Sequence, residues 1–197
     1  MNRRDALRRA SFAVGATAVP SAVLSLLQSC QSEPRLDWTP RFFTVAEATL
    51  VKALVETILP RTETPGGLDV NLDVFLDRLV ADTYDEASQS EFRSELAALN
   101  QRAGPDRGAD FADLGASDRE AFLRQEEKTG GKFNPGVWGT AVGEQEPVSF
   151  YRTLKSTLLW GYLSSEPIGR EVLRYDPVPG VYVGCIPLGA GERSWSF

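Results

Sequence analysis

The sequence contains no histidine among its 197 residues and only two cysteines, Cys30 and Cys185. The lack of histidine excludes Ser-His-Asp and Cys-His catalysis, His-ligated haem and the common His-containing zinc sites. Two thiols are too few for a thiolate cluster, and no Gly-rich dinucleotide fingerprint or haem-attachment motif occurs. We therefore expect no catalytic, cofactor-binding or metal-ligating residues in this chain.

Basic residues are also in deficit. The chain has 21 Lys and Arg against 27 Asp and Glu, a net charge of −6. Without the first 29 residues the balance becomes 17 basic to 26 acidic residues, a net charge of −9. An acidic body repels nucleic acid, so a nucleic-acid role is not expected. After the leader no apolar run is long enough to span a bilayer, and the remaining length suits one domain with a hydrophobic core.

The first 29 residues have the order of a secretory signal, with a basic start, an uncharged run and a small-residue exit. Arg3-Arg4, followed by Leu7, resembles a twin-arginine export signal, the kind that carries folded proteins. The alternative is an uncleaved membrane anchor from Ala10 to Ser29. Its polar residues, Gly15 and marginal length disfavour that interpretation.

The leader ends in Leu27-Gln28-Ser29-Cys30, which looks like a bacterial lipobox. It predicts removal of residues 1–29 and acylation of Cys30, which gives an exported, membrane-anchored lipoprotein on the periplasmic side. Residues 30–41 would form a polar tether and residues 42–197 a helical domain. With Cys30 acylated, Cys185 is expected to be a buried small apolar residue or to form an intersubunit disulfide. Without acylation, a Cys30–Cys185 disulfide is the alternative.

Apolar periodicity predicts a mainly α fold, a single domain of about five helices. The expected helices lie between Thr44 and Pro60, from about Val70 to Tyr84, from Ala87 to Ala103, from Ser117 to Gly130 and from about Pro147 to Tyr162. Capping-box spacing marks starts at Thr44 and Ser117, and Pro147 suits a first helical turn.

Beyond Ser164 the periodicity is lost, and prolines and glycines predict an irregular C-terminal arm that runs as an extended strap or short strands. The carboxylates of Asp69, Asp73 and Asp77 share one side of the second helix, where we expect a solvated face. A calcium site is not expected there, because the loop glycine and the closing glutamate are missing.

Two segments carry a family resemblance. Residues 58–67, I-L-P-R-T-E-T-P-G-G, resemble the I-I-P-x-T-x-T-P-G stretch of the gluconate 2-dehydrogenase subunit 3 family. Gly161-Tyr162 and the arm from Tyr175 to Cys185 resemble the Gly-Tyr and the G-Y-x-P-x-P-G-x-x-x-G-C arm of that family. The resemblance covers most of residues 42–187, except that residues 102–148 contain no motif of the family.

The resemblance implies a non-catalytic small subunit of an exported, flavin-dependent, GMC-type sugar or polyol dehydrogenase complex. In such complexes the large subunit carries FAD and a cytochrome c subunit often takes the electrons. The small subunit supports maturation and twin-arginine co-export of the large subunit. No cofactor is then expected in this chain. Our candidates for partner binding are Trp138, Tyr162, Tyr175, Pro179, Gly180, Tyr182, Cys185 and Trp195. For the aromatic residues of the arm, covering the core is as compatible with the sequence as contacting a partner.

Two other functions are alternatives to the companion subunit. One is a free-standing lipid-anchored periplasmic binding module, for instance one that binds carbohydrate through exposed tryptophan. The other is an enzyme acting alone through paired carboxylates, which residue types by themselves do not exclude.

Overall fold

The computed structural model describes residues 37–104, 110–133, 136–137, 140–141, 147–175, 180, 185, 187 and 189–195. The predicted export signal and Cys30 lie outside these residues. Within them the chain is mainly helical, and the number of α-helices agrees with the five that periodicity predicts. No helix of the described part is long and apolar enough to cross a membrane.

The elements follow one another in simple order. The α-helices are α2 (Val45–Ile58), α3 (Leu72–Thr83), α4 (Glu86–Ala103), α5 (Ala116–Thr129) and α6 (Phe150–Leu163). Single turns lie between or after them: η1 (Leu68–Val70), η2 (Phe111–Asp113) and the π-helical η3 (Ile168–Val172). Two short strands, β1 (Gly136–Val137) and β2 (Thr140–Ala141), pair antiparallel.

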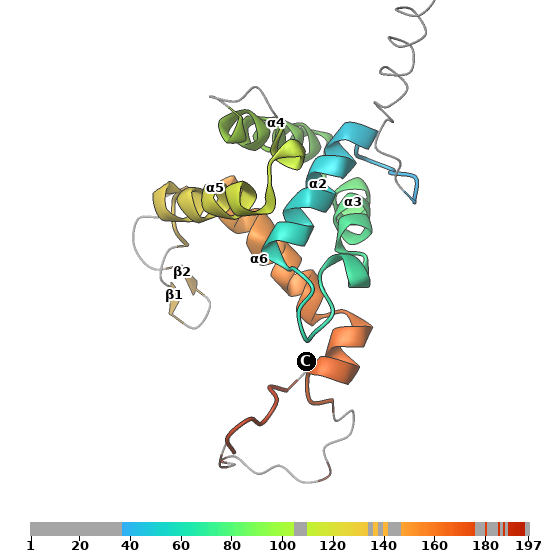
Figure 1. Cartoon of the computed structure of the whole chain (residues 1–197), viewed down its shortest axis with the longest axis vertical. Coiled ribbons are helices and arrows are strands. Elements are labelled where there is room, and N and C mark those ends of the chain that lie inside the picture. The colour runs from blue at the N-terminus through green and yellow to red at the C-terminus, as the bar shows by residue number, and fades with distance from the viewer. Residues whose placement is uncertain are drawn as a thin grey trace, which may run out of the picture. The chain divides into compact units, whose positions relative to one another are not determined.

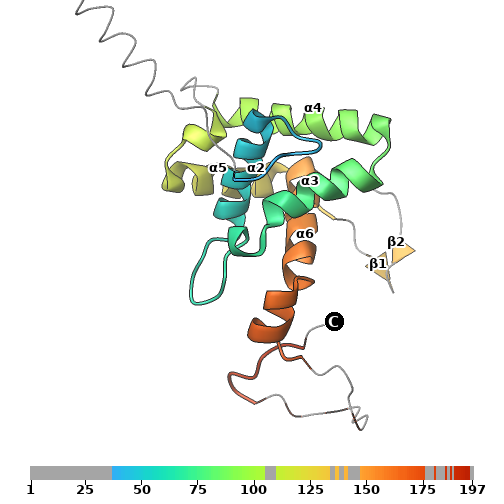
Figure 2. The ribbon, with the colours of Figure 1, turned by 90° about the vertical axis from the view of Figure 1, so that its right-hand side faces the viewer.

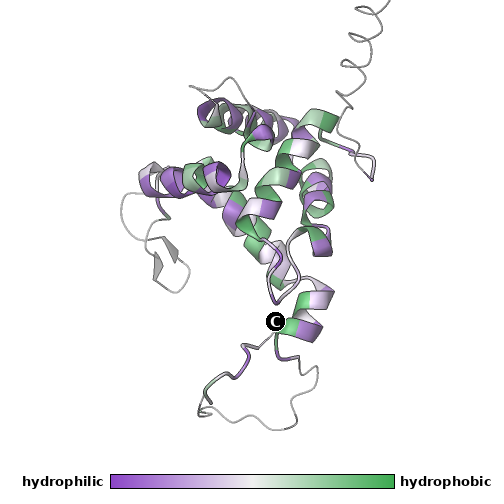
Figure 3. Cartoon of the chain, viewed as in Figure 1, coloured by the Kyte–Doolittle hydropathy of each residue, from purple (hydrophilic) through white to green (hydrophobic). Residues whose placement is uncertain are grey.

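The core is built around α2, most of whose residues are apolar (Figure 3). This helix packs against α3, α5 and η2, and α6 packs against α3, α4 and α5 (Figures 1 and 2). The other helices each present a narrower buried stripe, as the sequence predicts for α4 and α6. The stripe residues are Phe92, Leu96 and Leu99 of α4 and Tyr151, Leu154 and Leu158 of α6.

Helix starts agree with the prediction at one of the two expected capping boxes. The Thr44 hydroxyl accepts a hydrogen bond from the Glu47 backbone N–H at 3.2 Å, and the Glu47 carboxylate accepts one from the Thr44 N–H at 2.8 Å. The box expected at Ser117 is wrong, because α5 already begins at Ala116. Its N-cap is Gly115, which supplies no side-chain bond, so Ser117 lies inside the helix.

The prediction that Pro147 lies in the first turn of a helix is also wrong. It precedes α6, whose N-cap is Ser149. The Ser149 N–H donates to the Gly131 carbonyl at 3.1 Å, which holds the chain extended beside the end of α5 until the helix begins. The helix therefore starts three residues later than the proline suggests.

The aspartates of α3 overturn the expectation of a solvated face. Asp73 and Asp77 are buried, with exposed fractions of 5% and 1%. The Asp77 carboxylate accepts hydrogen bonds from three consecutive backbone N–H groups, those of Arg41, Phe42 and Phe43, at 2.8, 3.0 and 2.9 Å. These donors precede α2 and have no helical partner of their own, so a buried acceptor replaces water for them.

Asp73 completes this anchor. Its carboxylate accepts a hydrogen bond from the indole N–H of Trp38 at 3.2 Å. Trp38 and Phe42 also pack against the core. The end of the stretch assigned to the tether is therefore fixed on α3. Asp69 lies apart from this pair, in η1, where its carboxylate accepts a hydrogen bond from Gly66 of the preceding loop.

We predict that Asp77→Ala lowers the free energy of unfolding by about 3 kcal/mol, because it leaves three N–H groups without an acceptor. Asp82→Ala is the matched control on the same helix. It removes only an exposed bridge from Asp82 to the Arg41 side chain and should cost less than about 1 kcal/mol. Urea unfolding followed by circular dichroism measures both. Equal losses in the two variants would contradict the anchor.

Candidate functional site

Two segments 97 residues apart meet at the C-terminal end of α6. The Tyr162 hydroxyl donates a hydrogen bond to the carbonyl of Pro65 at 2.6 Å. Pro65 belongs to the loop of residues 60–67, which connects α2 to η1. The two sequence segments that carry the family resemblance are therefore joined directly in the fold.

Hydrogen bonds to the Asp69 carboxylate and the Leu59 carbonyl hold the base of this loop in place. The carboxylate of Asp69 accepts from the Gly66 N–H at 2.7 Å and from the Arg61 guanidinium at 2.9 Å. The Gly67 N–H donates to the Leu59 carbonyl at 2.8 Å. A Cβ on Gly66 would lie 2.7 Å from the Arg61 nitrogen, so only glycine permits this close turn. The base is thus fixed while the tip stays exposed.

A second close approach shapes α6 itself. Gly161 is buried, and a Cβ there would lie 2.6 Å from the ring of Phe75 on α3. The missing side chain lets Phe75 reach the helix, where its ring contacts that of Trp160 at a centroid distance of 5.9 Å. Trp160 is nevertheless 60% exposed, and Leu159 and Leu163 beside it are also exposed. We call Leu159, Trp160 and Leu163 the α6 end surface.

More exposed aromatic residues follow in the arm, beyond η3. Arg174 lies over the Trp195 ring at 4.1 Å, and Arg170 lies over Tyr175 at 5.8 Å. Tyr175 and Trp195 are about half exposed. Trp, Tyr and Arg are the residue types that dominate the binding energy of protein interfaces. The expectation that the chain beyond Ser164 lacks helix is wrong at η3, whose Ile168 is fully buried.

The predicted site residues fall into three groups. Tyr162 is half-buried and uses its hydroxyl inside the fold, whereas Tyr175, Gly180 and Trp195 are exposed. Cys185 is an exposed thiol, which corrects the expectation of a buried one. It follows η3 in the chain and is not among the residues of the hydrophobic core. The candidates that lie outside the described residues are Trp138, Pro179 and Tyr182.

Trp160 is the residue that sequence reasoning missed. It lies nine residues after Tyr151, which is two and a half helical turns and puts it on the side of α6 opposite that buried ring. A large apolar side chain on the solvent side of an amphipathic helix was the available signal.

Two pKa shifts in this part of the structure arise from the packing of the helices. Burial raises the pKa of Tyr151 to about 12. A hydrogen bond from Lys155 lowers the pKa of Glu127, which ties α5 to α6. Within the described ranges no group of three His, Cys, Asp or Glu side chains is placed to hold a metal ion. The arrangement is suited to contacting another macromolecule.

Comparison with known proteins gives one match. The family model described as gluconate 2-dehydrogenase subunit 3 matches residues 45–180. The matched range contains the 60–67 loop, the α6 end surface and Tyr175. No curated protein and no solved structure gives a match.

We predict that Tyr162→Phe loosens the loop. Loss of the bond to Pro65 should cost about 1 kcal/mol and speed hydrogen exchange of the Gly66 and Gly67 amides. Tyr175→Phe, which removes an exposed hydroxyl, is the control and should leave both quantities unchanged. Unaltered exchange at the two glycines in Tyr162→Phe would show that the hydroxyl does not hold the loop.

Proposed function

Because the chain belongs to the gluconate 2-dehydrogenase subunit 3 family, we propose that it is the non-catalytic small subunit of an exported, flavin-dependent, GMC-type sugar or polyol dehydrogenase complex. The observation that carries the proposal is the family match over residues 45–180. The large subunit of the complex holds FAD and performs the oxidation, and a cytochrome c subunit accepts the electrons. This chain supports maturation of the large subunit and its twin-arginine co-export.

The exposed aromatic residues support a role in binding the large subunit. The α6 end surface, Tyr175 and Trp195 all lie on α6 or on the segments that follow it. Burial of such side chains at an interface contributes strongly to affinity, and the fixed loop and η3 lower the conformational entropy lost on binding. The large subunit would dock on this end of the helical domain.

The leader supports the same assignment. A twin-arginine signal at Arg3 and Arg4 carries a folded complex, so the two subunits would assemble before export. A lipid on Cys30 would then hold the complex on the periplasmic side of the membrane. The hydrogen bond from Trp38 to Asp73 of α3 supports this proposal, because it joins the end of the proposed tether to the helical domain.

We predict that the wild-type chain co-purifies with a large FAD-containing subunit and that Trp160→Ala/Trp195→Ala weakens this association at least about tenfold, the effect of a typical hot-spot residue. Phe133→Ala is the matched control. It removes an equally exposed aromatic ring near the end of α5, away from the α6 end surface, and should have little effect.

Flavin absorbance and mass spectrometry identify the partner, and circular dichroism checks that each variant is folded. The purified chain alone should show no flavin absorbance and no dehydrogenase activity. An isolated chain that binds flavin, or that oxidises a sugar with an artificial acceptor, would overturn the companion role.

Two leader variants test export and anchoring separately. Replacing Arg3 and Arg4 with lysine should leave the precursor and its partner in the cytoplasm. Cys30→Ser should still be exported but appear in the soluble fraction, because an acidic domain has little affinity of its own for a membrane. Cell fractionation with immunodetection measures both. Normal export of the lysine variant would rule out the twin-arginine route, and a membrane-bound Cys30→Ser chain would rule out the lipid anchor.

A further inference from the structure

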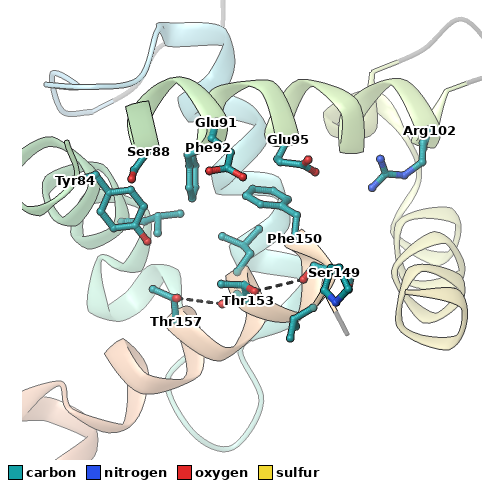
Figure 4. Close-up of a pocket in the computed structure, with 14 residues that line it drawn as sticks. Tyr84, Ser88, Glu91, Phe92, Glu95, Arg102, Ser149, Phe150, Thr153 and Thr157 are labelled. Atoms are coloured by element: carbon teal, nitrogen blue, oxygen red, sulfur yellow. Dashed lines mark hydrogen bonds between the residues drawn. The ribbon is translucent and has the colours of Figure 1, made fainter. Parts of the chain in front are cut away.

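A groove separates α4 from the N-terminal half of α6 (Figure 4). Its volume is about 710 Å³, within the range of pockets that hold a ligand or a large side chain. The groove lies on the same helix as the α6 end surface but is separate from it. Thr157, which lines the groove, precedes Trp160 by three residues, a rise of about 5 Å along the helix axis.

Two carboxylates stand over this groove. Glu91 and Glu95 lie one helical turn apart on α4 and extend toward α6 (Figure 4). Both are exposed, and neither forms a salt bridge with another described residue. Arg102, at one end of the groove, is bound to Glu126 at 2.8 Å and is also attracted by Glu95 without forming a salt bridge to it.

The floor of the groove is apolar. The rings of Phe92 and Phe150 meet edge to face at a centroid distance of 5.1 Å beneath the carboxylates. Leu154 of α6 is buried beside them. On the α6 side the hydroxyls of Thr153 and Thr157 donate to backbone carbonyls of their own helix, which leaves their oxygen lone pairs as acceptors. The groove therefore combines an apolar base with a rim of hydrogen-bond acceptors.

We propose that this groove receives a lysine or arginine side chain of the large subunit, an inference that rests on the proposed function. The aliphatic stem would lie on the Phe92 and Phe150 rings, and the cationic head would sit between Glu91 and Glu95. Basic side chains bind in this way because their stems are apolar and their heads carry the hydrogen-bond donors.

Charge decides between a cationic and an apolar occupant. An uncharged apolar segment would remove the two carboxylates from water without a partner, which costs free energy. A cationic head offsets one of the two charges and donates hydrogen bonds to both carboxylates, and hydroxyl acceptors take its remaining donors. The chain as a whole has a net charge of −6, so its field also favours the approach of a basic segment.

The position on α6 makes one partner sufficient for both surfaces. A segment of the large subunit bound across the α6 end surface would need to extend about one further helical turn to reach the groove. The apolar contact would supply most of the affinity, and the groove would fix the orientation of the partner along α6.

The first test removes charge. Glu91→Gln/Glu95→Gln should raise the dissociation constant for the purified large subunit about tenfold and reduce its salt dependence. Glu86→Gln/Asp113→Asn is the matched control, since it removes the same net charge from exposed positions outside the groove. The control should change the constant less than about twofold. Equal effects of the two double variants would indicate general attraction only and would overturn the proposal.

The second test fills the groove without changing charge. Thr153→Trp places a large ring in the groove and should weaken binding about as much as the glutamine pair. Ala97→Trp adds the same ring to an exposed position of α4 that does not line the groove, and should bind as the wild type does. Undiminished binding of a folded Thr153→Trp chain would show that no partner side chain enters the groove.

The wild-type measurement separates the two proposals. If the unaltered chain binds no FAD-containing subunit, the proposed function fails, and the groove proposal fails with it. If the wild type binds and the groove variants bind equally well, only the groove proposal is wrong. Circular dichroism and thermal unfolding of every variant exclude loss of fold as the cause of weaker binding.

Discussion

The fold depends on the carboxylate of Asp77. It is buried in α3 and accepts hydrogen bonds from three consecutive N–H groups of the segment that enters α2. That segment has no helix or strand to satisfy its donors, so the aspartate determines where the chain can begin the central helix. Because α2 packs against α3, α5 and η2, its position in turn fixes theirs. Asp73 and Trp38 extend the same contact toward the tether.

Periodicity was sufficient for the helices but not for this anchor. The buried stripes of α4 and α6 are long, regular and apolar, so their residues are predictable from spacing alone. Aspartates four residues apart have the same spacing as a solvated face, and only the folded position of Arg41, Phe42 and Phe43 shows why they are buried. The predicted starts of α5 and α6 were wrong for a related reason. At Gly115 and Ser149, backbone conformation and a distant carbonyl set the start, whereas local sequence favoured Ser117 and Pro147.

The segments that form the candidate surface can be recognised in the sequence, but the contacts that bring them together cannot. Both the 60–67 loop and Gly161-Tyr162 stand out in the sequence, but the bond from Tyr162 to Pro65 joins residues 97 positions apart. Helical spacing puts Trp160 on the solvent side of α6, but it does not predict the contact of Trp160 with Phe75 of α3. Its exposure follows from Gly161, which admits Phe75 and leaves the indole supported on one face and open on the other.

The contacts that hold α6 in place affect how a partner would bind to its exposed side. Tyr151, Leu154 and Leu158 fix one side of the helix in the core, while Gly161 and Tyr162 fix its end against α3 and the loop. The opposite side, where Trp160 contacts Phe75 and remains largely exposed, is therefore held rigid, and a rigid surface loses little entropy when a partner covers it. The α4–α6 groove shares this support, because Phe92 and Phe150 pack on each other and on the core. A partner that binds both surfaces would thus recognise the folded domain and not an unfolded chain, which is the selectivity that the proposed co-export of an assembled complex would require.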